Sequence, residues 1–305
     1  KRYTMKVWLD GTFRPEEEVR VSPLSHSFSR GSAIFEVLEI ISNPNGSALF
    51  GLDEHLDRFY RTAELVKMDI PFSRDVLLQA VLDTTRENGV KRGVCKFFAY
   101  YPSRELGLIP RDSSVSIAVY CMDYESVGFS PEEFYGPARV GISSFKKLHP
   151  DTVPVHAKVT GNYVNAYLAE REVMDKGFDD VIMVDTDGYI AEGATANIFF
   201  VKDGEVLTPR LRNIMTGITR MVVLEILASL DVPCRELDIY PEDVAWFDEA
   251  FYSGSINSIQ PVQSIDDIRM RGECPGPVTL KVQDVFRAIC NGENNNFDKW
   301  LTYVG

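Results

Sequence analysis

The sequence has few of the residues that build disulfide or metal-based scaffolds. It contains five cysteines and four histidines among 305 residues, with no CxxC pair and no histidine cluster at metal-ligand spacing. An odd, scattered set of thiols is typical of buried or incidental cysteines, not of a disulfide framework or a zinc site. We therefore expect no bound metal and no catalytic cysteine.

The chain also lacks an excess of positive charge and a long apolar run. Its formal net charge is -13, whereas nucleic acids and anionic membranes bind clusters of Lys and Arg. Neither is therefore expected as a partner. Asp10 and Glu16 to Glu18 interrupt the N-terminal region before an apolar stretch of signal-peptide length develops, and no later run approaches a membrane span. These features predict a soluble, cytoplasmic protein.

Length and periodicity predict two domains. A chain of 305 residues that is 45% apolar can bury one large core or two ordinary ones, and two domains are more common at this length. Residues 123–138 combine Gly, Pro and acidic side chains and break the periodicity, which predicts a linker between an N-terminal domain at 1–122 and a C-terminal domain at 139–305. Strands and helices of mixed order favour an α+β fold over a doubly wound parallel sheet.

Local patterns predict the elements of both domains. The Asp10-Gly11 pair predicts a hairpin, and Asp187-Gly188 and Asp203-Gly204 predict tight turns within a run of antiparallel strands at 179–209. Apolar periodicity predicts helices. The remaining expected elements are strands at 33–41, 94–101, 114–122, 233–240 and 249–253 and helices at 53–68, 74–88, 161–175, 219–230 and 278–290.

Lys158 is unusual because of its neighbours. In HAKVTGNYVNAYLA it is the only formal charge between Pro154 and Ala169. The ordinary interpretation is a lysine at a loop-helix junction with its ammonium in water. The alternative is a partly enclosed ammonium that loses hydration and becomes a nucleophilic amine, able to form a Schiff base.

Three other segments have both a structural and a functional interpretation. Gly217 and Thr219 begin an apolar helix, where they could be an ordinary cap or an anion site made by free backbone N–H groups. Glu192 lies between two predicted strands, where it could be a solvated turn residue or a buried acid that needs a cation. Residues 252–259, YSGSINSI, could form a plain loop or a second set of amide donors for a phosphate.

Together these segments carry a family resemblance. HAKVTGNYVNAYLA, GFDDVIMVDTDGYIAEGATANIFFVKDGEVLTP, GITRMVVLEI and DEAFYSGSINSIQPV occur in this order, after RGSAIFEV and DEHLDRF. The chain resembles the fold type IV pyridoxal phosphate enzymes, the class IV aminotransferases, which include branched-chain and D-amino acid aminotransferases, (R)-selective amine transaminases and aminodeoxychorismate lyases. The resemblance implies a small N-terminal α/β sandwich domain, a larger mixed, barrel-like C-terminal domain, pyridoxal 5'-phosphate as cofactor, and a homodimer.

The resemblance also implies roles for single residues. Lys158 would form the Schiff base and move the proton at the substrate α-carbon, Tyr163 would hydrogen-bond the phenolic oxygen of the cofactor, and Glu192 would pair with its pyridine nitrogen. The other positions implied at the cofactor are Arg58, Ile218, Thr219 and Ser255 at the phosphate and Asn197 beside the ring.

The substrate pocket departs from the branched-chain pattern. Where branched-chain enzymes present Tyr-x-Arg-Pro, this chain has Val94 and Lys96, which is more similar to the lyase branch, and Arg30 replaces a pocket tyrosine, whereas Phe35 keeps an aromatic position. Arg30, Lys96 and Arg104 would suit a dicarboxylic acceptor, or each could pair with a surface acid. The substrate residues that the resemblance implies are Arg30, Phe35, Lys96, Arg104 and Ile256.

We therefore predict a pyridoxal phosphate aminotransferase with a ping-pong mechanism. The expected donor is a branched-chain or other apolar L-amino acid, and the expected acceptor is a 2-oxo acid such as 2-oxoglutarate. The alternatives are an aminodeoxychorismate lyase, a D-amino acid aminotransferase and, outside enzymes, an inactive ligand-binding scaffold.

Overall fold

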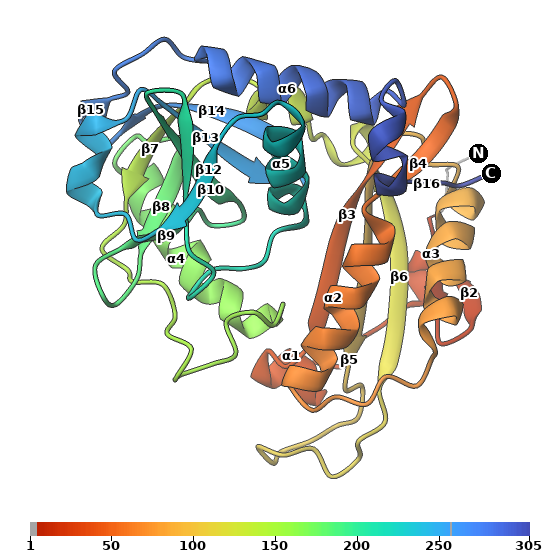
Figure 1. Ribbon diagram of the computed structural model, residues 1–305. Coiled ribbons are helices and arrows are strands. Elements are labelled where there is room, and N and C mark those ends of the chain that lie inside the picture. The colour runs from red at the N-terminus through yellow and green to blue at the C-terminus, as the bar shows by residue number, and fades with distance from the viewer. Residues whose placement is uncertain (1–4, 257) are drawn as a thin grey trace. The chain divides into compact units, whose positions relative to one another are not determined.

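The structure is a computed structural model that describes residues 5–256 and 258–305. The chain divides into two compact units (Figure 1). Of the described residues, unit 1 contains 5–129, 157–162 and 289–305, and unit 2 contains 130–156, 163–256 and 258–288. Among the described residues, none of the helices is both long and apolar enough to cross a lipid bilayer.

Unit 1 is built on an antiparallel sheet. The Asp10-Gly11 turn predicted from the sequence is confirmed, because both residues have positive φ (49° and 94°) and join a hairpin. In the part of the chain that the structure describes, the strand order is β16-β4-β3-β5-β6-β1-β2. The strands are β1 (Lys6–Leu9), β2 (Thr12–Pro15), β3 (Ile34–Asn43), β4 (Gly46–Phe50), β5 (Gly93–Tyr100), β6 (Ser116–Asp123) and β16 (Leu301–Tyr303).

Two helices, both expected from the sequence, cover one face of this sheet. α2 (Leu52–Leu65) and α3 (Arg74–Asn88) pack on it side by side (Figure 1), and their apolar side chains share one buried core with alternate residues of the strands. The register pairs Phe35 with Phe98 and Val37 with Lys96, so these four side chains point to the face opposite the helices. The short helix α1 (His26–Arg30) precedes β3.

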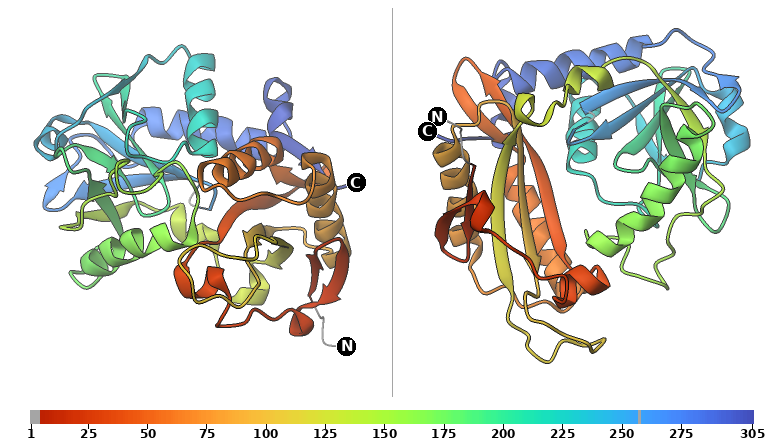
Figure 2. Two further views of the ribbon diagram at one scale, coloured as in Figure 1. Left: turned by 90° about the horizontal axis from the view of Figure 1, so that it is seen from below. Right: turned by 180° about the vertical axis from the view of Figure 1, so that it is seen from behind.

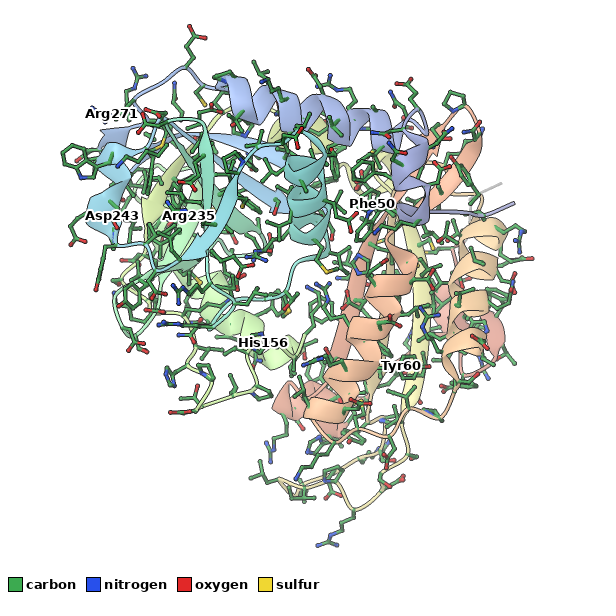
Figure 3. All side chains as sticks on the ribbon, in the orientation of Figure 1. Phe50, Tyr60, His156, Arg235, Asp243 and Arg271 are labelled. Atoms are coloured by element: carbon green, nitrogen blue, oxygen red, sulfur yellow. The ribbon has the colours of Figure 1, made fainter. Side chains whose placement is uncertain are left out.

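Two segments predicted in the C-terminal domain belong instead to unit 1. Residues 157–162 lie beside the start of β3, because the amides of Phe35, Thr160 and Gly161 donate to the carbonyls of Lys158, Ala33 and Gly31 at 3.1, 2.9 and 2.9 Å. The C-terminal segment joins the sheet through β16, which pairs with β4. There the ring of Phe50, labelled in Figure 3, stacks on Trp300 with centroids 6.2 Å apart.

Unit 2 contains a mixed sheet that the sequence predicts only in part. The β8–β9 and β10–β11 hairpins are confirmed, with positive φ at Gly188, Asp203 and Gly204. The predicted antiparallel run at 179–209 is confirmed only within these two hairpins, because β9 and β10 are not neighbours in the order of the described strands, which is β12-β11-β10-β13-β14-β7-β8-β9 with β15 beside β14. Three other pairs of this sheet are parallel. The strands are β7 (Ala138–Ile142), β8 (Asp180–Val184), β9 (Ile190–Glu192), β10 (Asn197–Lys202), β11 (Glu205–Pro209), β12 (Cys234–Leu237), β13 (Glu249–Gly254), β14 (Ser258–Ile265) and β15 (Ile268–Arg269).

The sheet of unit 2 curls around one core. Apolar side chains from strands at both ends of the order pack together in a single buried cluster, which a flat sheet would keep apart. Outside the sheet lies α4 (Tyr163–Met174), the light green helix in Figure 2. Its Ala166, Ala169 and Val173 pack against Val181 and Met183 of β8. The other helices are α5 (Ile218–Ser229) and α6 (Pro277–Cys290). An α+β chain with an α/β sandwich and a barrel-like part is thus confirmed.

Candidate active site

Lys158 is fixed by its backbone to two elements of unit 1. Its amide donates to Thr62 Oγ1 of α2 at 3.2 Å, and its carbonyl accepts from the Phe35 amide of β3. Its side chain is half-buried, and the amine lies 5.0 Å from the centroid of the Phe35 ring. The close approach of Gly161 to Gly31 holds this segment against the sheet, since a Cβ on Gly31 would lie 2.9 Å from Gly161 Cα. The partly enclosed amine predicted from the sequence is present.

A second amine lies over the same aromatic surface. The Lys96 amine is 5.4 Å from the ring centroids of both Phe35 and Phe98, which stack with centroids 5.6 Å apart. Burial lowers the pKa of Lys96, and the positive charge of Lys158 lowers it further. The structure therefore brings Lys158, Phe35 and Lys96 together on one aromatic surface.

Arg58 belongs to a buried charged cluster on the helix-covered face of the sheet. Its Nε and Nη2 donate to Glu36 Oε1 and Oε2, both at 2.7 Å, and His55 Nδ1 donates to Oε2 at 2.7 Å. Burial alone raises the pKa of Glu36, but the charges and hydrogen bonds of Arg58 and His55 outweigh it, so the pKa is well below its usual value. Burial lowers the pKa of His55, partly opposed by Glu36. Glu36 thereby orients the Arg58 guanidinium.

The other two predicted cations of unit 1 are exposed. Arg30 ends α1, and its Nη2 donates to the Leu106 carbonyl at 3.1 Å. Arg104 lies in the loop after β5 and forms an isolated bridge with Ser25. Of the three predicted substrate cations, Lys96 alone has a half-buried side chain against aromatic rings.

Glu192 ends β9 and is the central acid of unit 2. Only 4% of the residue is exposed, so it is buried and not the solvated turn residue of the ordinary interpretation. Three groups hold its carboxylate: the Lys147 ammonium 2.6 Å from Oε1, the Asn197 Nδ2 group 2.9 Å from Oε2, and the Met215 amide 3.1 Å from both oxygens. Both carboxylate oxygens therefore accept hydrogen bonds, and Lys147 places a positive charge beside them.

Asn197 links Glu192 to the start of α5. Its Nδ2 group also donates to the Met215 carbonyl at 3.0 Å, and its Oδ1 lies where a Cβ on Gly217 would approach to 2.0 Å. Gly217 caps α5 without a side-chain hydrogen bond, and Ile218 and Thr219 form its buried first turn. The first N–H groups of a helix have no partner within the helix, so this end can bind an anion. Glu192, Asn197, Ile218 and Thr219 therefore lie in one connected region.

The remaining predicted residues of unit 2 are half-buried. Tyr163 is the first residue of α4, directly after the 3-10 turn Thr160–Asn162. Ser255 and Ile256 lie in the turn between β13 and β14, where Gly254 packs against Ala196, since a Cβ would lie 3.3 Å from the Ala196 Cβ.

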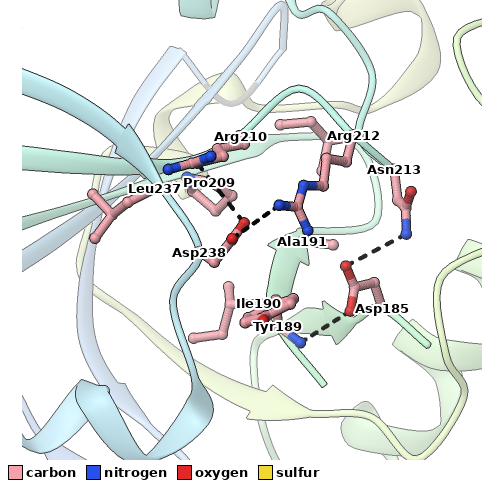
Figure 4. A pocket seen from close by; sticks show the side chains of 11 residues that line it. Asp185, Tyr189, Ile190, Ala191, Pro209, Arg210, Arg212, Asn213, Leu237 and Asp238 are labelled. Atoms are coloured by element: carbon pink, nitrogen blue, oxygen red, sulfur yellow. Dashed lines mark hydrogen bonds and ion pairs between the residues drawn. The ribbon is translucent and has the colours of Figure 1, made fainter. Parts of the chain in front are cut away.

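A small pocket lies beside β9 (Figure 4). Arg212 and Arg210 approach Asp238 at 3.0 and 3.9 Å, so the charges in its wall compensate one another. Asn213 Nδ2 donates to the buried Asp185 at 3.4 Å. These contacts anchor the loop that carries Met215, and the pocket thus helps to position the Glu192 site.

Sequence reasoning missed Glu36, His55 and Lys147. The alternation along β3 could have placed Glu36 on the buried face, and the spacing of His55 and Arg58 places both on one face of α2. No comparable signal distinguishes Lys147 from its neighbour Lys146, because the loop that holds them has no periodic pattern.

Comparison with known proteins gives full-length matches. A model of the amino-transferase class IV family matches residues 33–265. The branched-chain-amino-acid aminotransferase of Pseudomonas aeruginosa is 31% identical over 299 residues, which cover 98% of this chain and 97% of that protein.

Solved structures agree with this match. The branched-chain aminotransferase of Thermoproteus uzoniensis with norvaline has a TM-score of 0.93 and 34% identity, covering 99% of this chain and 100% of that chain. The branched-chain amino acid aminotransferase of Thermobaculum terrenum in its PLP-form has a TM-score of 0.93 and 26% identity, covering 100% of both chains.

Proposed function

Because this chain belongs to the class IV amino-transferase family, we propose that it transfers amino groups between branched-chain amino acids and 2-oxo acids, with pyridoxal 5'-phosphate as cofactor. The observation that carries the proposal is the Glu192 carboxylate, buried and held by Lys147, Asn197 and the Met215 amide. A buried acid of this kind is a receptor for a cationic ring nitrogen.

The residues present fit the cofactor chemically. Glu192 offers a carboxylate for the ring nitrogen, and Lys158 offers a half-buried amine for the aldehyde. The first turn of α5, with the Thr219 hydroxyl, offers donors for the phosphate, and the Arg58 guanidinium oriented by Glu36 offers charge. When bound, pyridoxal phosphate supplies an electron sink that stabilises negative charge at the substrate α-carbon.

We assign the following roles to the residues of this chain. Lys158 attaches the cofactor and, as a neutral amine, moves the proton at the α-carbon. Glu192 holds the proton on the ring nitrogen, and Tyr163 donates to the phenolic oxygen. Arg58, Ile218, Thr219 and Ser255 hold the phosphate, and Asn197 fixes Glu192 through its 2.9 Å hydrogen bond.

We assign the substrate carboxylate to Lys96. Its amine lies over Phe35 and Phe98, and its pKa is lowered by burial and by the Lys158 charge. A bound carboxylate would offset both the loss of hydration of the Lys96 ammonium and its repulsion by Lys158. The apolar rings beside it suit an aliphatic side chain. Arg30, Arg104 and Ile256 are the other substrate residues that the resemblance implies, and a dicarboxylic acceptor such as 2-oxoglutarate would use the charge of the two exposed arginines.

The test is a half-reaction followed by absorbance. Purified protein loaded with pyridoxal phosphate should be yellow, and borohydride should fix the chromophore covalently; single additions of L-leucine, L-valine or L-isoleucine without acceptor should bleach it. The Lys158→Ala variant should bind no reducible chromophore, whereas Lys146→Ala, an exposed lysine in another segment, should behave as wild type. A wild-type protein that stays colourless with added cofactor would refute the proposal.

The same experiment distinguishes the rival functions. Bleaching by D-amino acids alone would indicate the D-amino acid branch. Pyruvate released from aminodeoxychorismate without an acceptor would indicate the lyase branch, to which the strand that carries Lys96 is more similar. A chromophore that no amino compound discharges would indicate a binding scaffold.

We further propose a homodimer in the cytoplasm. The five cysteines are free, which is typical of a reducing compartment. Sedimentation equilibrium would measure the assembly, and fractionation of expressing cells would measure the location.

A further inference from the structure

Lys147 is built into unit 2 and is not a loosely placed surface lysine. Its amide donates to the Val184 carbonyl of β8 at 2.9 Å. The residues on either side of it contact Asn165 of α4: the Leu148 amide donates to Asn165 Oδ1 at 3.3 Å, and Asn165 Nδ2 donates to the Lys146 carbonyl at 2.9 Å. The backbone of Lys147 is therefore fixed from both sides, and its side chain is 16% exposed.

The side chain brings a full positive charge to a buried acid. The Lys147 ammonium lies 2.6 Å from Glu192 Oε1, and the Glu192 side chain is 5% exposed. The other donors to this carboxylate, Asn197 Nδ2 and the Met215 amide, are neutral. A charge pair at this distance with little solvent is much stronger than an exposed one. Lys147 therefore determines how much negative charge Glu192 presents to any further cation.

We propose that Lys147 is a positioning residue that shares the charge of Glu192 and so sets how firmly Glu192 holds a proton on the ring nitrogen of the cofactor. This inference rests on the proposed function. A second cation is attracted less strongly to a carboxylate that is already paired with an ammonium than to an unpaired carboxylate, because the ammonium repels the second cation. Removing the Lys147 charge, while Asn197 and Met215 keep the carboxylate in place, strengthens the attraction between Glu192 and a protonated ring nitrogen.

Two ligands separate this effect from every other part of the site. Pyridoxal phosphate and its 1-deaza analogue, in which C–H replaces the ring nitrogen, have the same aldehyde and the same phosphate. Contributions from Lys158 and from the phosphate donors therefore cancel in the ratio of their dissociation constants. The ratio therefore measures how much the interaction between Glu192 and the ring nitrogen contributes to the binding free energy.

The experiment measures this ratio by titrating apoprotein with each ligand at neutral pH. The charge-removing variants Lys147→Met and Lys147→Gln should raise the preference for pyridoxal phosphate over the analogue by about tenfold, the size of one charge interaction in a partly screened site. Lys147→Arg should restore the wild-type ratio, and the exposed neighbour Lys146→Met should not change it. Two neutral variants are used so that a folding defect in one does not decide the result.

Some results of this titration would overturn the role proposed for Lys147, and another would refute the proposed function. Equal losses for both ligands, which leave the ratio unchanged, would show that Lys147 is only structural and would overturn the inference. A ratio that falls in the neutral variants would overturn it as well, because the sign would be wrong. A wild-type protein that binds neither ligand would instead refute the proposed function.

Discussion

Replacing Glu36 by glutamine tests whether the buried charged cluster of unit 1 stabilises the fold. The carboxylate accepts three hydrogen bonds of 2.7 Å, two from Arg58 and one from His55, and is fully buried. Glutamine keeps the shape but removes the negative charge beside a guanidinium whose side chain is 12% exposed. Breaking a buried pair from one side costs about 3–5 kcal/mol. We expect the free energy of unfolding of unit 1 to fall by about that amount at pH 7.

Glu39, three residues further along β3, provides the matched control. Burial raises its pKa to about 7, although Arg92 and the Tyr124 hydroxyl oppose the shift. Glutamine resembles the protonated acid, so Glu39→Gln should change stability little near pH 5. Above pH 7 the wild-type protein carries a buried charge that the variant lacks, and the variant should then be more stable by about 3 kcal/mol.

The pH dependence of Glu36→Gln provides a second check. A carboxyl whose pKa is lowered by folding stabilises the folded state above its unfolded pKa, and this contribution is lost as the pH falls through the folded pKa. The pKa of Glu36 is lowered from 4.5, since Arg58 and His55 outweigh the effect of burial. The deficit of the variant should therefore be full at pH 7 and should shrink below about pH 4.5.

Tryptophan fluorescence during urea unfolding can follow unit 1. Trp8 and Trp300 lie in this unit and are 7% and 2% exposed, whereas Trp246 lies in unit 2 and is 58% exposed. Equal stability of Glu36→Gln and wild type at pH 7 would refute the reasoning, as would the same loss in both glutamine variants.

Two glycine substitutions give the remaining predictions. Gly161→Ala would place a Cβ 2.9 Å from the Gly31 carbonyl oxygen and displace the Lys158 segment. We therefore expect at least about tenfold less borohydride-fixed cofactor in this variant. Gly136→Ala, which has open space around its Cβ position, should match wild type. Gly217→Ala would place a Cβ 2.0 Å from Asn197 Oδ1 and disturb both Glu192 and the start of α5, so we expect about tenfold weaker binding of pyridoxal phosphate by absorbance titration. Unchanged binding in either variant would contradict the geometry that we assign to its segment.

The sequence predicts the local elements well because their signals are local. The helix expected at 74–88 has the same bounds in the structure, since the Ser73 hydroxyl accepts from the Val76 amide and Gly89 ends the helix with φ of 59°. Hairpins at Asp-Gly pairs are confirmed for the same reason. The order of the strands in unit 2 depends on contacts far apart in the chain, and periodicity contains no information about them.

The placement of residues 157–162 shows the same limit. Their contacts with β3 and with the segment just before it are hydrogen bonds to residues more than a hundred positions earlier in the chain, such as Thr160 Oγ1 to the Gly31 carbonyl at 3.0 Å. The motif around Lys158 identifies the lysine as unusual, but only the structure shows that Phe35 provides both the backbone partner and the ring beside the amine.

The two glutamates of β3 show why the charged part of a site is the hardest to predict. Both are buried, and their odd separation places them on opposite faces of the sheet. Glu36 faces α2, where His55 and Arg58 hold it ionised, whereas Glu39 has the Tyr124 hydroxyl at 3.5 Å and a raised pKa. Alternation predicts the two faces, but the partner on each face decides whether a buried acid is a charge or a neutral group. The same dependence on a non-local partner makes Lys147, and not the neighbouring Lys146, the residue that forms an ion pair with Glu192.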